Sequence, residues 1–242
     1  MNTTELDEMM RKRLLKAASG PGRTTLECAV AGRRLLWAVG LRGASLAKRA
    51  LDVVGSALLI IAFLPVLAVV ALLIKLEDGG PLIFTQNRVG KFGRMFRMYK
   101  FRSMCVNAEQ RMAEVLAQNQ HQTGVTFKMK TDPRITKVGR WLRKLSVDEL
   151  PQLFNVLIGD MSLVGPRPPV PREVALYTLA DRRRLAVKPG ITCFWQVGGR
   201  AELDFPQQVA LDVSYIERQS ILTDLIILFK TVPAVIGGKG AC

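Results

Sequence analysis

The chain is poor in the residues that build many metal and hydrolase sites. It has one histidine, His121, which stands inside a polar run of Gln and Asn. Histidine-based metal sites and Ser-His-Asp catalysis are therefore not supported. The cysteines are scattered, without the paired spacing of a zinc site, and indicate reduced cytosolic thiols. They are Cys28, Cys105, Cys193 and Cys242.

Acidic residues are also scarce. The 242 residues contain 35 Lys and Arg against 20 Asp and Glu, which gives a net charge of +15. Such an excess predicts an acidic partner: nucleic acid, anionic lipid or a phosphorylated substrate. Nucleic acid is disfavoured, because the chain has long uncharged segments and no recognisable nucleic-acid-binding motif.

The start of the chain does not resemble a secretory signal. Glu5, Asp7 and Glu8 occupy it, and the long apolar run begins only near Leu51, with no cleavage pattern after it. Residues 1–47 are rich in Arg and Gly and show little periodicity. We treat them as a basic N-terminal extension.

The longest apolar run is Val53–Ile74, 22 residues without a charge. At a rise of about 1.5 Å per residue it matches a bilayer core, so a single transmembrane helix is the simplest interpretation. Pro65, near the centre, predicts a kink or break instead. Lys48 and Arg49 precede the run and Lys75 follows it, so the positive-inside tendency would keep both flanks on the cytoplasmic face. We therefore favour a re-entrant helix over residues 48–76, broken at Pro65.

After the apolar run, residues 77–242 have the pattern of a cytosolic, mostly helical α+β domain. Two short strand candidates, Pro81–Gln86 and Arg97–Arg102, surround a Gly90–Gly93 turn and predict a small β-hairpin. A helix is expected at Glu109–Gln120.

Two further segments of this domain are apolar on one face or throughout. Ile221–Phe229 is too short to span a membrane and would lie in the interface or pack in the core. In the other segment, residues 150–159, the apolar residues have the spacing of one helical face, and a glycine follows as a stop signal. Its residues are Leu150, Leu153, Phe154, Leu157, Ile158 and Gly159.

An adjacent acidic pair, Asp148-Glu149, stands just before this helix. Pro151 is tolerated in a first helical turn, so the helix is expected to start close to the pair. The two side chains would diverge by about 100°. One carboxylate could bind a metal or attack phosphorus while its neighbour manages protons or metal-bound water. The alternative is a helix cap with first-turn acids, which is the commoner use of such residues.

Arg167 lies in the proline-rich stretch Gly165–Pro171. Pro166 and Pro168 stiffen the backbone around it, so the guanidinium loses little entropy on binding. A rigid planar cation suits a diphosphate or a nucleobase edge. The alternative is a linker or a proline-rich ligand.

Other cations are candidates for binding phosphate. Alternation along a strand places Lys100 and Arg102 on one face, where the alternative is a solvated charged face. Trp195 would stack a base or, as is more usual, be buried. The remaining candidates are Arg88, Arg134 and Arg140.

Several of these residues belong to motifs that follow one another in a fixed order. The motifs are Lys48–Asp52, Tyr99–Met104, Asp132–Thr136, Ser146–Pro168, Lys188–Thr192 and Asp212–Tyr215. In this order the chain resembles the bacterial sugar transferases, the monotopic polyprenyl-phosphate phosphoglycosyltransferases that begin exopolysaccharide, O-antigen and glycoprotein glycan assembly. Residues 1–47 fall outside the resemblance. Leu64 precedes Pro65 where the family often has serine, so a hydroxyl partner for the exposed backbone is missing at the predicted break.

The resemblance implies an enzyme at the cytoplasmic face of the bacterial inner membrane, with residues 77–242 as the catalytic domain. It implies that Asp148 attacks a UDP-sugar, forms a phosphosugar-aspartate and releases UMP, and that polyprenyl phosphate then takes the phosphosugar. Glu149 and Mg²⁺ would support Asp148, and Arg167 would hold the nucleotide. Inner-membrane lipid would surround the re-entrant helix, and interfacial helices leave room for a homodimer. The motifs do not identify the sugar.

A second hypothesis belongs to a different class of protein. The chain would be a basic, membrane-anchored binding or scaffold protein in which Asp148 and Glu149 only cap a helix. Turnover of a UDP-sugar distinguishes the two hypotheses.

Overall fold

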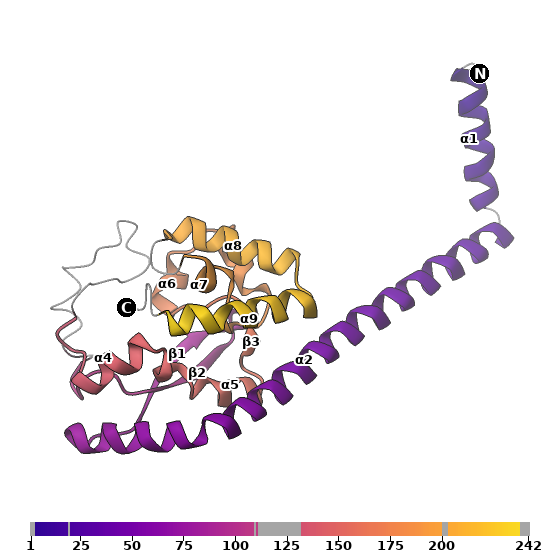
Figure 1. Cartoon of the computed structure of the whole chain (residues 1–242). Helices are drawn as coiled ribbons and strands as arrows, with labels where there is room; N and C mark the ends of the chain where they lie inside the picture. The colour runs from indigo at the N-terminus through magenta and orange to yellow at the C-terminus, as the bar shows by residue number, and fades with distance from the viewer. Residues whose placement is uncertain (1–2, 19, 109, 111–131, 200–202, 238–242) are drawn as a thin grey trace. The chain divides into compact units, whose positions relative to one another are not determined.

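The computed structural model describes residues 3–18, 20–108, 110, 132–199 and 203–237, and the chain forms two units, residues 1–47 and 48–242 (Figure 1). The first unit consists of α1 (Thr3–Ala18) and the beginning of α2 (Gly20–Asp78). Helix therefore occupies a region in which the sequence shows little periodicity.

The second unit contains two small sheets. β1 (Ile83–Val89) pairs with β2 (Met95–Phe101) in an antiparallel hairpin, which confirms the predicted hairpin with slightly shifted strand ends. The turn η1 (Lys91–Gly93) connects them, with Phe92 at a φ of 56° and Gly93 in the left-handed region. β3 (Ser162–Val164) and β4 (Gly190–Thr192) form a parallel pair.

Helices and helical turns surround these sheets, so the mixed helix and sheet content of the prediction is confirmed (Figure 1). The expected helix at 109–120 falls, except for Gln110, outside the described residues. The remaining elements are α4 (Lys137–Lys144), η2 (Val147–Glu149), α5 (Gln152–Ile158), α6 (Pro171–Ala175), η3 (Asp181–Ala186), α7 (Phe194–Gly198), α8 (Phe205–Glu217) and α9 (Ile221–Ile236).

The long apolar helix is exposed. The segment Gly43–Asp78 is long and apolar enough to cross a membrane, and only 11% of its most apolar window is buried. Pro65 lies inside α2, and the helix continues through it rather than breaking into two. A proline removes only one backbone hydrogen bond of the helix, so bending is the milder outcome. Figure 1 shows such a bend in the C-terminal half of α2; membrane re-entry stays a prediction.

The beginning of the α2 segment in the second unit is fixed by hydrogen bonds. The Arg49 guanidinium donates to the carbonyls of Val156 (2.6 Å) and Leu157 (2.7 Å), at the end of α5 where carbonyls lack helical partners. The buried Asp52 carboxylate accepts from the backbone N–H of Leu163 at 2.9 Å. The motif at 48–52 therefore joins the apolar helix to the core.

Helix α5 buries a different face from the predicted one. Leu153 is buried, but Phe154 and Ile158 are 45% and 65% exposed. The buried Asn155 replaces them: its amide accepts a hydrogen bond from the backbone of β2 at 3.0 Å and donates one to it at 2.7 Å. The helix packs through this polar side chain because β2 presents unpaired backbone groups there.

Candidate active site

The acidic pair occupies the turn η2 between α4 and α5. Ser146 adopts a left-handed conformation (φ 55°) that directs the chain into this turn. Pro151, and not an acid, is the N-cap of α5, and no side chain caps that helix end. Asp148 is only 7% exposed. No acidic side chain therefore caps α5, and both acids lie instead in the helical turn η2 that precedes it.

The pKa values of the two carboxyl groups are shifted in opposite directions. Burial, assisted by the neighbouring Glu149 charge, raises the pKa of Asp148 to about 6, although Lys100 and Arg143 oppose the rise. Burial would also raise the pKa of Glu149, but Lys100 and then Arg167 lower it below its ordinary value. Lys100 Nζ donates to Glu149 Oε1 at 2.7 Å. Glu149 is thus a fixed charge, while Asp148 is ionised at neutral pH in an environment that penalises its charge.

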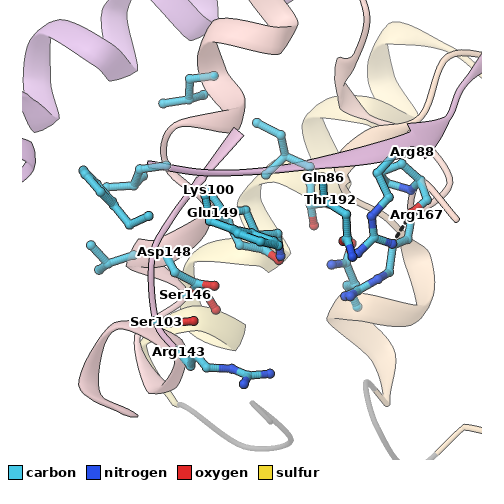
Figure 2. A pocket seen from close by; sticks show the side chains of 18 of the residues that line it. Gln86, Arg88, Lys100, Ser103, Arg143, Ser146, Asp148, Glu149, Arg167 and Thr192 are labelled. Carbon is cyan, nitrogen blue, oxygen red and sulfur yellow. Dashed lines mark hydrogen bonds and ion pairs between the residues drawn. The ribbon is translucent and has the colours of Figure 1, made fainter. Parts of the chain in front are cut away.

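Arg88 and Arg167 lie together on one side of the cavity, across from Asp148 (Figure 2). The proline-rich segment runs beside β1, where Arg88 Nη1 donates to the carbonyl of Pro168 at 2.8 Å. Arg88 is buried, and its Nε has no hydrogen-bond partner among the described residues. Burial, followed by the charge of Arg167, lowers the pKa of Arg88 to about 10. Two cations held this close favour an anion between them.

These groups open into one large cavity of about 2210 Å³ (Figure 2). It is larger than the roughly 300–1,000 Å³ of a typical small-molecule site. One part of its wall is polar and charged, and another part is formed by apolar side chains of α2 and α9. Most of the predicted site residues line it: Arg88, Lys100, Arg102, Arg134, Asp148, Glu149, Arg167 and Pro168.

Three predicted cations differ in their surroundings from the rest. Arg140 is exposed on α4 and is not among the residues that line the cavity, so the structure does not bring it to the site. Arg134 forms an ion pair with Asp132 at 2.6 Å, which gives it a structural partner. Arg102 is paired with Asp78 at the end of α2, and its Nη1 has no hydrogen-bond partner within the described chain.

Some lining residues were missed by sequence reasoning. Arg143 is one of several cations in a basic stretch, and only the helical turn of α4 distinguishes it from Arg140. Ser103, Ser146 and Thr192 also line the cavity (Figure 2). The left-handed conformation of Ser146, which has no local sequence signal such as glycine, could not be foreseen.

One lining residue, Arg184, belongs to a buried ion pair. Arg184 Nη2 donates to Asp212 Oδ2, and both side chains are almost inaccessible to solvent. The Arg184 guanidinium also lies over the rings of Tyr177 and Phe205. Trp195 is 7% exposed, in agreement with the buried interpretation rather than the base-stacking one, although it still borders the cavity.

The carboxyl groups fit a Mg²⁺ ion that is completed by substrate. Mg²⁺ in proteins commonly uses one or two carboxylates together with phosphate oxygens and water. Asp148 and Glu149 supply two such carboxylates, and hydrogen bonding from Lys100 involves one Glu149 oxygen. Across the described ranges no group of three acidic, histidine or cysteine side chains converges, so a cage made only of protein ligands is not present there.

Comparison with known proteins decides the family. The bacterial sugar transferase model matches residues 43–238. The chain belongs to the bacterial sugar transferases. The match covers the apolar helix from Gly43 and every element that lines the cavity, so the acidic pair and the cations belong to the family domain.

The chain is similar to proteins whose names state several different activities. It is 51% identical over 200 residues to "Galactosyl transferase CpsE" of Streptococcus agalactiae, covering 81% of this chain and 43% of that protein. It is 43% identical over 203 residues to "Undecaprenyl-phosphate galactose phosphotransferase" of Salmonella typhimurium, covering 83% of this chain and 42% of that protein. "Exopolysaccharide production protein ExoY" of Sinorhizobium fredii is 41% identical over 199 residues, 81% of this chain and 88% of that protein. The chain thus spans less than half of the first two relatives and most of the third.

Proposed function

We propose that this protein transfers a sugar-1-phosphate from a UDP-sugar to polyprenyl phosphate, the first membrane step in assembly of an exopolysaccharide or related glycan. The observation that carries the proposal is the buried Asp148 carboxyl facing a cavity with Arg88 and Arg167 on its other side. Related proteins are named undecaprenyl-phosphate phosphotransferases for galactose and for glucose. The named sugars differ, so the sugar taken by this chain is not assigned.

The reaction proceeds in two displacements at one phosphorus atom. An Asp148 oxygen attacks the sugar-bearing phosphorus of the UDP-sugar; the new O–P bond forms as the bond to UMP breaks, and UMP leaves with the electron pair. A phosphate oxygen of polyprenyl phosphate then attacks the same phosphorus. The bond to Asp148 breaks, which returns the carboxylate and gives polyprenyl-diphosphate-sugar. With a pKa of about 6, Asp148 is ionised at pH 7.5 and ready to attack.

The cations of the site reduce the repulsion between this carboxylate and the anionic substrate. Arg88 and Arg167 would bind the nucleotide phosphates, since both guanidinium groups line the cavity and one is preorganised by prolines. Lys100 holds Glu149 in its ionised form. Asp148 and Glu149 would hold Mg²⁺, which when bound neutralises diphosphate charge and polarises the phosphoryl group.

The way in which both ends of the apolar segment are held supports the proposed membrane arrangement. At its beginning, Lys48 Nζ donates to the carbonyl of Val164 at 3.2 Å. At its end, Asp78 pairs with Arg102, the residue that follows β2, and Glu77 accepts from the backbone N–H of Val138 at 3.1 Å. Because both ends bind the same folded unit, they would lie on one side of the bilayer. This supports re-entry of the segment near Pro65, with the catalytic domain on the cytoplasmic face of the inner membrane.

The activity is tested with purified protein in nanodiscs that contain polyprenyl phosphate and Mg²⁺. Wild type should release UMP from at least one member of a UDP-sugar panel, and Asp148→Asn should lower this rate at least 1,000-fold, in the range of a lost covalent nucleophile. Arg140→Gln, which changes a charge outside the cavity, is the matched control and should stay near wild type. Absence of UMP release from every UDP-sugar, or full activity of Asp148→Asn, would refute the proposal.

The topology has its own test. Single cysteines placed at exposed positions in α1 and in α8 should both react with a membrane-impermeant maleimide from the cytoplasmic side. A reaction of the α1 cysteine only from the periplasmic side would show that the segment spans the membrane.

A further inference from the structure

The cavity at Asp148 has an apolar half that the acidic pair and the arginines leave unused. On α2 this half is formed by Leu51, Gly55, Leu58 and Leu59. Their spacing of four, three and one residues places them on one face of the helix. Leu58 and Leu59 are 62% and 37% exposed, so this part of the face does not belong to the packed core.

Helix α9 faces the same space with a second apolar stripe. Leu225, Leu228, Phe229 and Val232 line the cavity and again follow helical spacing. Phe229 and Val232 are 76% and 57% exposed, which means that little of the described chain covers them. In contrast, Ile226 of the same helix is exposed but is not among the lining residues.

The opposite face of α9 is fixed to the core, so the stripe is held in position. Lys48 Nζ of α2 forms an ion pair with the buried Asp224 at 2.6 Å, and Tyr215 donates to the same carboxylate at 2.8 Å. Ile227 is completely buried. The Lys48–Asp224 pair therefore joins α2 to α9, the two helices that carry the apolar stripes.

The apolar half is continuous with the phosphate-binding half. Thr192 lies beside Arg88 and Arg167 in Figure 2, and its hydroxyl is 2.8 Å from that of Thr231 on α9. In the proposed reaction the acceptor phosphate must approach phosphorus from the side that UMP leaves, which is the side of these arginines. A chain attached to that phosphate would then meet α9.

We propose that the stripes of α2 and α9 form the binding groove for the isoprenoid chain of the acceptor, with its phosphate between Arg88 and Arg167. This inference rests on the proposed function. One amphiphile satisfies both halves: an anion for the buried cations, and a long apolar chain for the two stripes. A cavity of about 2210 Å³ also exceeds what a nucleotide-sugar of ordinary ligand size would fill.

The test compares acceptors of different chain length. For wild type and each variant, kcat/KM is measured in the same detergent for undecaprenyl phosphate and for geranyl phosphate, and their ratio is the readout. Phe229→Gln/Val232→Gln should lower this ratio by at least tenfold, because burying one such side chain against an apolar ligand is worth about a factor of ten or more. Ile226→Gln, the matched control on α9, should leave the ratio within twofold of wild type.

The alternative outcomes separate the hypotheses. An equal loss of the ratio in Ile226→Gln would mean that α9 only contacts bulk lipid, and an unchanged ratio in the double variant would overturn the groove. If wild type releases no UMP from any UDP-sugar, the proposed function itself fails. A photoreactive long-chain polyprenyl phosphate gives a second readout: it should label α9, and excess undecaprenyl phosphate, but not phospholipid, should suppress the label.

Discussion

Replacing the proposed nucleophile should stabilise the protein. Asp148 has a pKa raised from 3.8 to about 6, chiefly by burial. At about 1.4 kcal/mol per unit of pKa, holding this carboxylate ionised costs about 3 kcal/mol of folding free energy above pH 6. Asp148→Asn keeps the shape of the side chain and removes the charge. The variant should therefore be more stable than wild type by up to about 3 kcal/mol at pH 7.5.

The stability difference between Asp148→Asn and wild type should depend on pH in a defined direction. The folded state binds the Asp148 proton more tightly than the unfolded state, so the stability of wild type falls as pH rises from about 4 to 6 and is then constant. The advantage of Asp148→Asn should be largest above pH 6 and disappear near pH 4. For a chain of this size, 3 kcal/mol corresponds to roughly 6–12 °C in Tm.

The assay is thermal unfolding of wild type and variants in one detergent between pH 4 and pH 8. Glu149→Gln is the matched control, because it changes the adjacent acid, whose pKa is lowered. It removes a charged partner of Lys100 and should destabilise by about 1.5–3 kcal/mol. An Asp148→Asn variant that is no more stable than wild type at pH 7.5, or whose advantage grows as pH falls, would refute the reasoning.

Three further predictions concern activity and stability. First, kcat/KM for UMP release should fall about tenfold per pH unit below a pKa near 6, as Asp148 is protonated; a flat profile from pH 5 to 8 would contradict its role. Second, Arg167→Lys should raise KM for the UDP-sugar about tenfold, since a point charge replaces a planar donor; steady-state kinetics with unchanged KM would exclude it from substrate binding. Third, Asp212→Ala should destabilise by about 3–5 kcal/mol by leaving Arg184 buried without its partner, and Asp212→Ala/Arg184→Met should regain much of this in thermal unfolding; no recovery in the double variant would contradict the account.

Local patterns were sufficient for the features that depend on neighbouring residues. The hairpin follows from two strand-like runs around a glycine-containing turn, and Gly159 ends α5 in the expected left-handed conformation (φ 101°). Pro151 correctly marked the start of that helix. In each case the physical cause lies within a few residues of its effect.

Features that depend on distant contacts could not be predicted in this way. The burial of Asn155 instead of Phe154 depends on unpaired backbone groups of β2, more than 50 residues away. Arg140 and Arg143 look equivalent in the sequence, yet only Arg143 lines the cavity. Pro65 was expected to break α2, but the helix continues through it. Arg88 and Arg167 are likewise brought together by tertiary packing, which places the proline-rich segment beside β1.

The central claim, covalent catalysis by Asp148, is tested most directly by trapping the intermediate. Wild type is incubated with a UDP-sugar labelled at the β-phosphorus, without polyprenyl phosphate, and its peptides are analysed by mass spectrometry. The account predicts one phosphosugar on the peptide that contains Asp148, lost when polyprenyl phosphate is added and absent from Asp148→Asn. A label on another residue, or product formation by Asp148→Asn at the wild-type rate, would contradict it.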